Sequence, residues 1–307
     1  MIVKERKKPK ELLLLELLSN RKMLSARDYK KYQNLSLGYE GELRFDAYTK
    51  KYGEKLIMLN DLLLRHNEQY FQIDSCVITN DAIYLFEIKN YQGQYYFDKD
   101  ILYKVPNKEI ENPILQRNRA TSLFRMFLQS KGIQSPLKSY IIFIHPQCTI
   151  YQTPLNQQII FHSNIQSFLT KLNENQYSSK KSQSIVKVLE SSVHQEFLPE
   201  NSLSYTFDEL QKGIPCCQCG SMNTELINRT IKCSDCETEE VASDSIIRCI
   251  NEFQELFPSE KLTSGIISKW CGNSIAQARC KRMLLKHFSK RGETKNVHYI
   301  KEEEAHP

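Results

Sequence analysis

Charged side chains interrupt an otherwise apolar pair of predicted strands, and they limit what this part of the chain can fold into. The segments 70–78 and 82–90 are rich in aromatic and β-branched residues and have the length of strands. Because side chains alternate along a strand, Glu87 and Lys89 share one face of the second segment, and Asp74 lies a hairpin's distance earlier. Burying such charges is costly unless they are paired or bind an ion. The pattern therefore predicts a polar site where two neighbouring strands end.

Two carboxylates and a lysine that converge on one point suit metal-assisted hydrolysis of phosphodiesters. Mg²⁺ prefers oxygen ligands, usually one or two carboxylates together with waters and phosphate oxygens. The bound metal acidifies water and neutralises charge on the phosphate, and a lysine beside it orients the water or stabilises the transition state. Each residue alone also has an ordinary interpretation: Glu87 and Lys89 suit a half-exposed strand face, and Asp74 suits a strand end before a turn.

The remaining predicted elements alternate between helices and strands, which is the order of an α/β domain. Helices are predicted at 10–24, 36–52, 113–129 and 164–172, and strands at 56–61, 94–104, 139–146 and 158–162. The glycines of the 36–52 helix, Gly38 and Gly41, are expected to let it approach a sheet closely. The strand 139–146 is apolar throughout, as is typical of a strand buried on both faces. A loop is predicted at 173–184 and a further helix near 184–195.

Four short motifs follow one another along the chain: Gly-x-x-Gly-Glu at 38–42, Phe-Gln-Ile-Asp at 71–74, Glu-Ile-Lys-Asn-Tyr-x-Gly at 87–93 and Asn-Pro-x-x-Gln at 112–116. Over residues 36–172 this set resembles the nuclease-related domain (NERD) family, which belongs with the PD-(D/E)XK restriction-endonuclease-like nucleases. The resemblance implies a central mixed sheet flanked by helices. It also implies Asp74 and Glu87 as ligands of Mg²⁺ (or Mn²⁺) and Lys89 as the catalytic lysine.

The same resemblance implies that Glu42 and Gln116 line this site. The helical spacing agrees for Gln116, which lies four residues before Ala120 and eight before Phe124 on an apolar stripe, where a polar side chain needs a partner. The ordinary alternatives are a solvated helix charge for Glu42 and a satisfied core amide for Gln116.

Five of the ten cysteines fall between residues 216 and 236. Two Cys-x-x-Cys pairs, Cys216/Cys219 and Cys233/Cys236, are separated by a stretch that suits a short hairpin, and this spacing resembles a zinc ribbon with one structural Zn²⁺. Cys217 is an alternative ligand to Cys216, and both remain open. Free or redox-active cysteines are the less favoured interpretation.

Residues 261–295 carry nine Lys and Arg and one Glu, which gives a local charge of +8. They predict two helices around a turn, with a capping box from Ser274 to Gln277. The inward face of the second helix is predicted to hold Ala276, Cys280, Met283, Leu284 and Phe288. Lys281 and Arg282 then point outward, as on a helix-turn-helix recognition helix that binds nucleic acid, although basic helical hairpins are also common elsewhere.

The domains predicted from these features are an N-terminal helical segment (1–35), a nuclease-related α/β domain (36–172), a helical connector (173–204), a zinc ribbon (205–240) and a basic helical tail (241–307). Since no export signal or membrane span of about 18 apolar residues is found, we expect a cytoplasmic location without a membrane partner. The expected function is a Mg²⁺-dependent nuclease whose ribbon and tail bind the substrate, with DNA favoured over RNA. The alternative is a non-catalytic nucleic-acid-binding or regulatory protein that keeps a nuclease-like fold.

Overall fold

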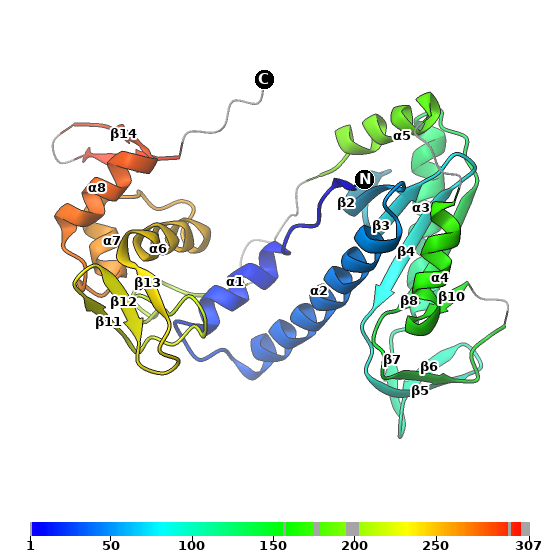
Figure 1. The fold of residues 1–307 in the computed structure, drawn as a ribbon, viewed down its shortest axis with the longest axis horizontal. Helices are drawn as coiled ribbons and strands as arrows, with labels where there is room; N and C mark the ends of the chain where they lie inside the picture. Colours follow the sequence, from blue (N-terminus) through cyan, green and yellow to red (C-terminus); the bar gives the residue numbers. More distant parts are fainter. Residues whose placement is uncertain (1, 156–157, 175–178, 195–202, 294–295, 302–307) are drawn as a thin grey trace. The chain divides into compact units, whose positions relative to one another are not determined.

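The computed structural model describes residues 2–155, 158–174, 179–194, 203–293 and 296–301 (Figure 1). The chain forms two compact units. The first unit comprises Met1–Pro9 and Gln33–Phe197, and the second comprises Lys10–Tyr32 and Leu198–Pro307. Each unit has apolar core clusters of its own.

A mixed six-stranded sheet forms the centre of the first unit. Its order is β1 (Ile2–Lys4), β2 (Ile57–His66), β3 (Gln69–Ile78), β4 (Ile83–Lys89), β8 (Leu137–Phe143) and β10 (Ile159–Phe161). Strands β2, β3 and β4 form an antiparallel meander, whereas β1, β8 and β10 pair in parallel with their neighbours. This confirms the predicted α/β class with a central mixed sheet flanked by helices.

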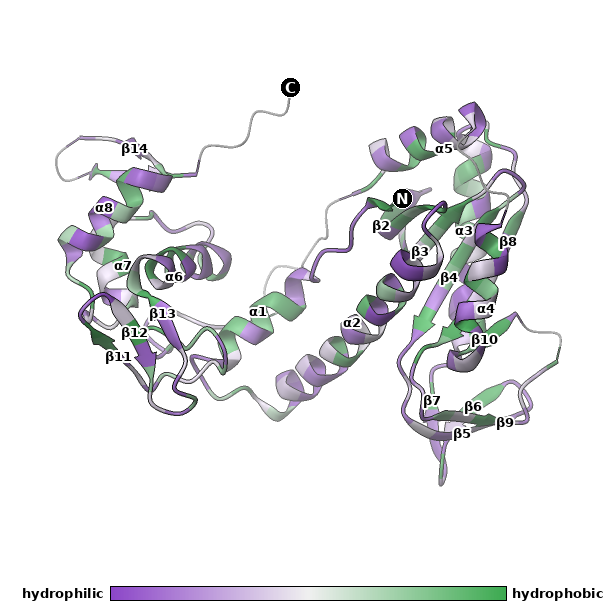
Figure 2. Ribbon diagram, viewed as in Figure 1, coloured by the Kyte–Doolittle hydropathy of each residue, from purple (hydrophilic) through white to green (hydrophobic). Residues whose placement is uncertain are grey.

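Helices pack on both faces of this sheet because its strands are apolar on both sides. In β4, Tyr84, Phe86 and Ile88 belong to a core cluster with α2 (Ala26–Tyr52) and α4 (His162–Asn173). The alternate residues Ile83 and Leu85 belong to a second cluster with α3 (Pro113–Ser130) and α5 (Lys180–Ser191). The helices that cover the sheet carry both hydrophilic and hydrophobic residues along their length (Figure 2).

Two predicted helix starts are wrong. The helix predicted from residue 36 begins at Ala26, because the Ser25 side chain accepts a hydrogen bond from the backbone N–H of Asp28 (3.1 Å) and caps a polar first turn that lacks an apolar stripe. The helix predicted near 184 begins at Lys180. There Ser179 and Ser182 form a capping box inside the stretch predicted as a loop.

A second, four-stranded sheet follows β4. Its order is β7 (Lys108–Ile110), β6 (Ile101–Lys104), β5 (Gly93–Asp98) and β9 (Cys148–Tyr151). The single strand predicted at 94–104 is therefore two strands joined by a tight turn, in which Lys99 has a positive φ of 54°. Its inner side chains pack against Phe143 of β8 and Ile114 of α3, so this sheet lies beside the end of β4 where the charged residues occur.

The second unit contains a small three-stranded sheet and several helices. The sheet is β11 (Thr224–Ile227), β12 (Thr230–Cys233) and β13 (Glu239–Val241), the helices are α1 (Lys10–Ser19), α6 (Ala242–Leu256), α7 (Ser264–Trp270) and α8 (Gln277–His287), and β14 (Ser289–Arg291) pairs with β15 (His298–Ile300). The buried Arg21 guanidinium lies 3.7 Å from the ring centroid of Trp270 and pairs with Glu252 at 2.6 Å. This core thus holds a paired internal charge as well as apolar side chains.

Candidate active site

Strands β3 and β4 bring Asp74 and Glu87 to the same place. Ser75 and Phe86 form the last pair of the antiparallel ladder, and Asp74 and Glu87 are the residues that adjoin this pair on each strand. The two carboxylates are therefore close together at this end of the strands, and, besides burial, the charge of Glu87 raises the pKa of Asp74. Asp74 Oδ2 also accepts a hydrogen bond from the backbone N–H of Ile88 at 2.8 Å, which fixes its position against β4.

Lys89 lies on the same face as Glu87, and its Nζ pairs with Glu87 Oε1 at 2.7 Å. Both side chains are less than a fifth exposed. Burial alone would lower the pKa of Lys89, but the negative charge of Glu87 reverses the effect and the pKa is raised. The lysine is therefore held in its charged form beside the carboxylates.

The carboxylates repel one another in a buried environment. Burial raises the pKa of Asp74 well above its usual range, and the charges of Glu87 and Glu42 raise it further. The pKa of Glu42 is also raised, first by burial. Like charges brought together away from water need a compensating cation. The oxygen-only donor set of Asp74 and Glu87 fits a hard divalent ion such as Mg²⁺.

Arg6 is a member of this cluster that the sequence analysis missed. Its guanidinium is 2% exposed, bonds Glu42 at 2.9 Å and Asp46 at 3.0 and 3.2 Å, and donates to the carbonyl oxygen of Asp74 at 2.8 Å and to Ser75 Oγ at 3.0 Å. The β2–β3 ladder lacks a pair at Asp61 and Asp74, where Asp61 has a positive φ of 55°. Arg6 therefore reaches a strand carbonyl that the neighbouring strand does not bond.

Gly41 lets α2 approach the end of β4. A Cβ at Gly41 would lie 2.5 Å from Asn90 Cβ, so a larger residue would push the helix off the loop after Lys89. Asn90 Nδ2 also donates to the carbonyl of Leu37 at 2.8 Å. The same expectation for Gly38 is wrong, because a Cβ there would meet no atom within 4 Å.

The Asn-Pro-x-x-Gln motif begins α3. Asn112 is the N-cap and accepts from the N–H of Ile114 at 2.9 Å, while Pro113 occupies the first turn, where its missing N–H costs nothing. Gln116 lies one turn further on, half-buried, and no described residue donates to its buried Oε1. The Oδ1 atom of Asn90 is a second buried acceptor without a donor in the described part of the chain. Acceptors of this kind suit a bound ligand or water.

Comparison with protein families matches residues 37–144 to the nuclease-related domain, NERD. Residues 37–144 form a NERD domain. This stretch holds Glu42, Asp74, Glu87, Lys89 and Gln116, and membership of the family suggests nuclease-like activity. Comparison with curated proteins gave no match, and comparison with solved structures gave none either.

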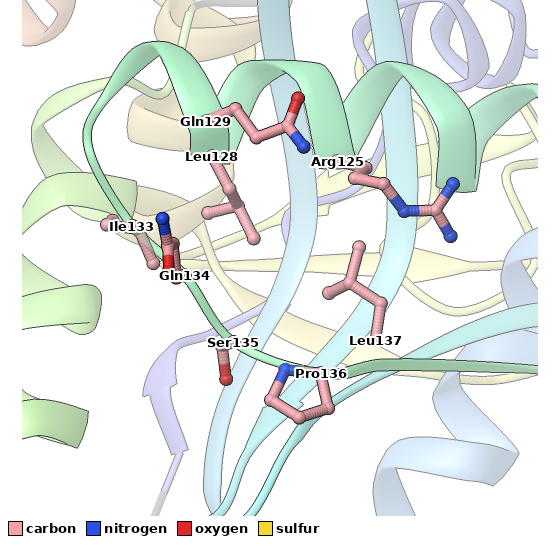
Figure 3. A pocket seen from close by; sticks show the side chains of 8 residues that line it. All are labelled: Arg125, Leu128, Gln129, Ile133, Gln134, Ser135, Pro136 and Leu137. Carbon is pink, nitrogen blue, oxygen red and sulfur yellow. The ribbon is translucent and has the colours of Figure 1, made fainter.

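A pocket of about 440 Å³ in the same unit lies away from the NERD carboxylates (Figure 3). It is lined by the end of α3, including Arg125 and Gln129, and by the segment that leads into β8. Leu137, at this end of β8, pairs with Ile83, the first residue of β4, whereas Ile141 pairs with Glu87 further along. This pocket therefore lies at the opposite end of the strands and contributes nothing to the carboxylate site.

Downstream of the NERD domain, the cysteines form a four-sulfur cluster. The Sγ atoms of Cys216, Cys219, Cys233 and Cys236 lie within 4.8 Å of one another, with 3.6 Å between Cys216 and Cys236 and 3.7 Å between Cys219 and Cys233. Four sulfurs at about 2.3 Å from a tetrahedral zinc would be separated by about 3.8 Å, so the cluster fits structural zinc. Cys217 lies outside this group and is exposed. The geometry therefore favours Cys216 as the ligand.

The two basic helices predicted at the end of the chain are α7 and α8, and the exposed Lys281 and Arg282 lie on α8. The predicted capping box is wrong. The N-cap of α8 is Ala276, without a side-chain bond, and Ser274 Oγ instead donates to the carbonyl of Cys271 at 2.6 Å. Ala276 is exposed rather than buried, because Ile275 fills the core at the helix entrance.

In the part of the chain that the structure describes, no helix is long and apolar enough to cross a membrane.

Proposed function

We propose that the NERD domain hydrolyses phosphodiester bonds of nucleic acid with the help of Mg²⁺ or Mn²⁺. The observation that carries this proposal is the pair of neighbouring, poorly exposed carboxylates, Asp74 and Glu87, whose mutual repulsion a divalent cation would relieve. The NERD family match supports the same reaction class. DNA is favoured over RNA as the substrate.

Asp74 and Glu87 would hold the metal, which when bound supplies an activated water and neutralises charge on the phosphate. Lys89, held charged at 2.7 Å from Glu87, is suited to orient the attacking water and to stabilise charge that develops on the phosphate oxygens. Glu42, held by Arg6 at 2.9 Å, lines the same site. Gln116 offers a free acceptor, Oε1, to a water or to the substrate.

The second unit is proposed to hold the nucleic acid. Lys281 and Arg282 lie exposed on α8, where their charges can neutralise phosphates. The four-cysteine module is proposed to bind one structural zinc ion, which would give so small a module the stability to carry this role.

The experiment that tests catalysis incubates the purified chain with single- and double-stranded DNA and RNA in Mg²⁺, Mn²⁺ or EDTA. Asp74→Ala and Glu87→Ala should each reduce metal-dependent cleavage by about a hundredfold or more, because each removes a metal ligand. Glu109→Ala, which removes an exposed carboxylate of β7, is the matched control and should cleave as the wild type does.

Wild-type cleavage rates in both ligand variants would refute the assignment. Binding of nucleic acid without cleavage in either metal would instead favour the non-catalytic alternative, in which the fold serves as a binding platform.

A further inference from the structure

A second pocket in the first unit, of about 610 Å³, lies beside α2 on its Arg44 side. The residues that matter for its chemistry are Arg44, Tyr48, Lys51 and Tyr52 of α2, His145 after β8, and His162 at the start of α4. We call it the Arg44 pocket. Its volume is within the range of about 300–1,000 Å³ that is typical of small-molecule sites.

The lining of the Arg44 pocket is positively charged. Arg44 and Lys51 supply two permanent cations, two histidines lie with them, and no carboxylate is among the described residues that line it. Burial lowers the pKa of His145, and the charges of Arg44 and His162 lower it further. Arg44 does pair with Glu40 at 2.6 Å, but this is an exposed surface pair that an anionic ligand can displace.

Aromatic rings lie among these charges. The rings of Tyr48 and Tyr52 are 6.0 Å apart, and His162 meets Tyr48 edge-on, with its Nε2 2.9 Å from the Tyr48 hydroxyl. Lys51 Nζ lies 5.1 Å from the centroid of Tyr52. Cations beside tyrosine faces are the combination that binds a phosphate together with a nucleobase.

The Arg44 pocket is connected to the end of β4. Ile144, which lines it, donates its N–H to the carbonyl of Lys89 at 3.0 Å. Gln147, also in the lining, accepts from the N–H of Gly93 at 3.0 Å and from Gln92 Nε2 at 2.9 Å. Ile144 and Gln147, which follow β8, are thus bonded to Lys89 and to the loop after it. The strand β8 is the neighbour of β4, which carries Glu87.

We propose that the Arg44 pocket binds one nucleoside phosphate, with the phosphate at Arg44 and Lys51 and the base against the tyrosines. This assignment rests on the proposed function. The Arg44 pocket lies beside β4, a position that suits a nucleotide unit next to the phosphodiester bond to be cut. A free nucleotide carries the same chemistry, so the two sources are separated by experiment.

Binding is measured with the full chain in EDTA, where metal-dependent cleavage does not interfere. The probes are a fluorescein-labelled eight-nucleotide single-stranded DNA, followed by fluorescence anisotropy, and AMP, followed by calorimetry. The background variant Lys281→Ala, Arg282→Ala removes binding through α8. Arg44→Ala and Lys51→Ala should each weaken binding by about three- to tenfold, because each removes a charged contact to phosphate.

Two controls separate a lost contact from a damaged fold. Lys50→Ala removes the neighbouring exposed lysine, which does not line the pocket, and should leave binding unchanged. Glu40→Ala should tighten binding, because it frees Arg44, and a folding defect cannot do that. Tyr48→Leu should weaken binding through loss of the ring, whereas Tyr48→Phe should retain it.

Weaker binding of the oligonucleotide in the Arg44 and Lys51 variants supports the nucleotide unit of a strand. If these variants weaken binding of AMP but not of the oligonucleotide, the result supports a free nucleotide in the same pocket. Wild-type affinity of both variants for both probes overturns the proposal. Because no metal is present, this result is independent of whether Asp74→Ala and Glu87→Ala abolish cleavage, so the pocket and the proposed hydrolysis can fail separately.

Discussion

Arg6 joins three separate segments of the first unit. Its guanidinium neutralises Glu42 and Asp46 on α2 and bonds the backbone of Asp74 on β3. Without Arg6, the poorly exposed carboxylates of Glu42 and Asp46 would have no cation beside them, close to Asp74, whose pKa burial and the charge of Glu87 already raise. Arg6 therefore acts as an internal counter-ion of the candidate site.

Replacing Arg6 with Ala should destabilise the chain by about 3–5 kcal/mol, the cost of leaving buried charges without their partner. Urea unfolding followed by circular dichroism measures this change in the free energy of unfolding. Lys7→Ala removes an exposed neighbouring charge and should leave stability unchanged. Equal stability of Arg6→Ala and the wild type would show that Glu42 and Asp46 do not depend on this pair.

Single residues were predictable where a local rule decides their position. Period-two alternation is enough to place Glu87 and Lys89 on one face, and the hairpin length brings Asp74 close to Glu87. Arg6 was not predictable, because its partners lie 36 to 69 residues away and no local pattern marks a contact of that range. Gly38 and Gly41 look alike in the sequence, and only the packing of α2 on Asn90 separates them.

At the scale of elements, α3, β3 and β4 were predicted close to their observed bounds, whereas the start of α2, the end of β2 and several short strands were not. The helix α3 and the strand β3 begin and end within one residue of the expected ranges. The strands β1 and β9 have three or four residues each and pair with β2 and β5, which are distant in the sequence. The start of α8 was misplaced because Ser274 bonds backward to Cys271 rather than forward into the helix.

The four-cysteine module permits a prediction that separates Cys216 from Cys217. Cys216→Ser removes a thiolate from the four-sulfur cluster and should lower zinc content from about one ion per chain toward zero, as should the double variant Cys233→Ser, Cys236→Ser. Cys217→Ser should retain the metal, because its sulfur lies outside the cluster. Elemental analysis of the purified chains gives the zinc content directly.

Retained zinc in Cys216→Ser together with loss in Cys217→Ser would reverse the ligand assignment. If the wild-type chain contains no metal and all four thiols of the cluster can be titrated, the four-cysteine module does not bind zinc.

Over the whole molecule, the candidate functions are divided between two units with separate cores. The first unit holds the carboxylates and the Arg44 pocket, and the second holds the four-cysteine module and α8. The net charge of the chain is only +6, whereas residues 261–295 alone carry +8, so the excess of positive charge is concentrated in this segment of the second unit. A concentrated basic region favours a polyanionic partner over a neutral one.

The proposed role of α8 predicts a change in salt dependence. Each phosphate that the chain neutralises releases counter-ions, so the logarithm of the binding constant for duplex DNA falls by about 0.9 per contact for each tenfold rise in salt. Lys281 and Arg282 are exposed, while Cys280 and Leu284 on the same helix fill the core, so changing the two basic residues to Ala should leave α8 packed. We expect weaker binding across all sequences and a slope shallower by about 1.8, measured by anisotropy over a salt series.

The matched control is Lys181→Ala, Lys187→Ala, which removes two exposed lysines from α5 in the first unit and should change neither quantity. Unchanged affinity and slope in the α8 variant would assign its basic face to solvent or to a protein partner, and nucleic-acid binding would then have to come from the first unit.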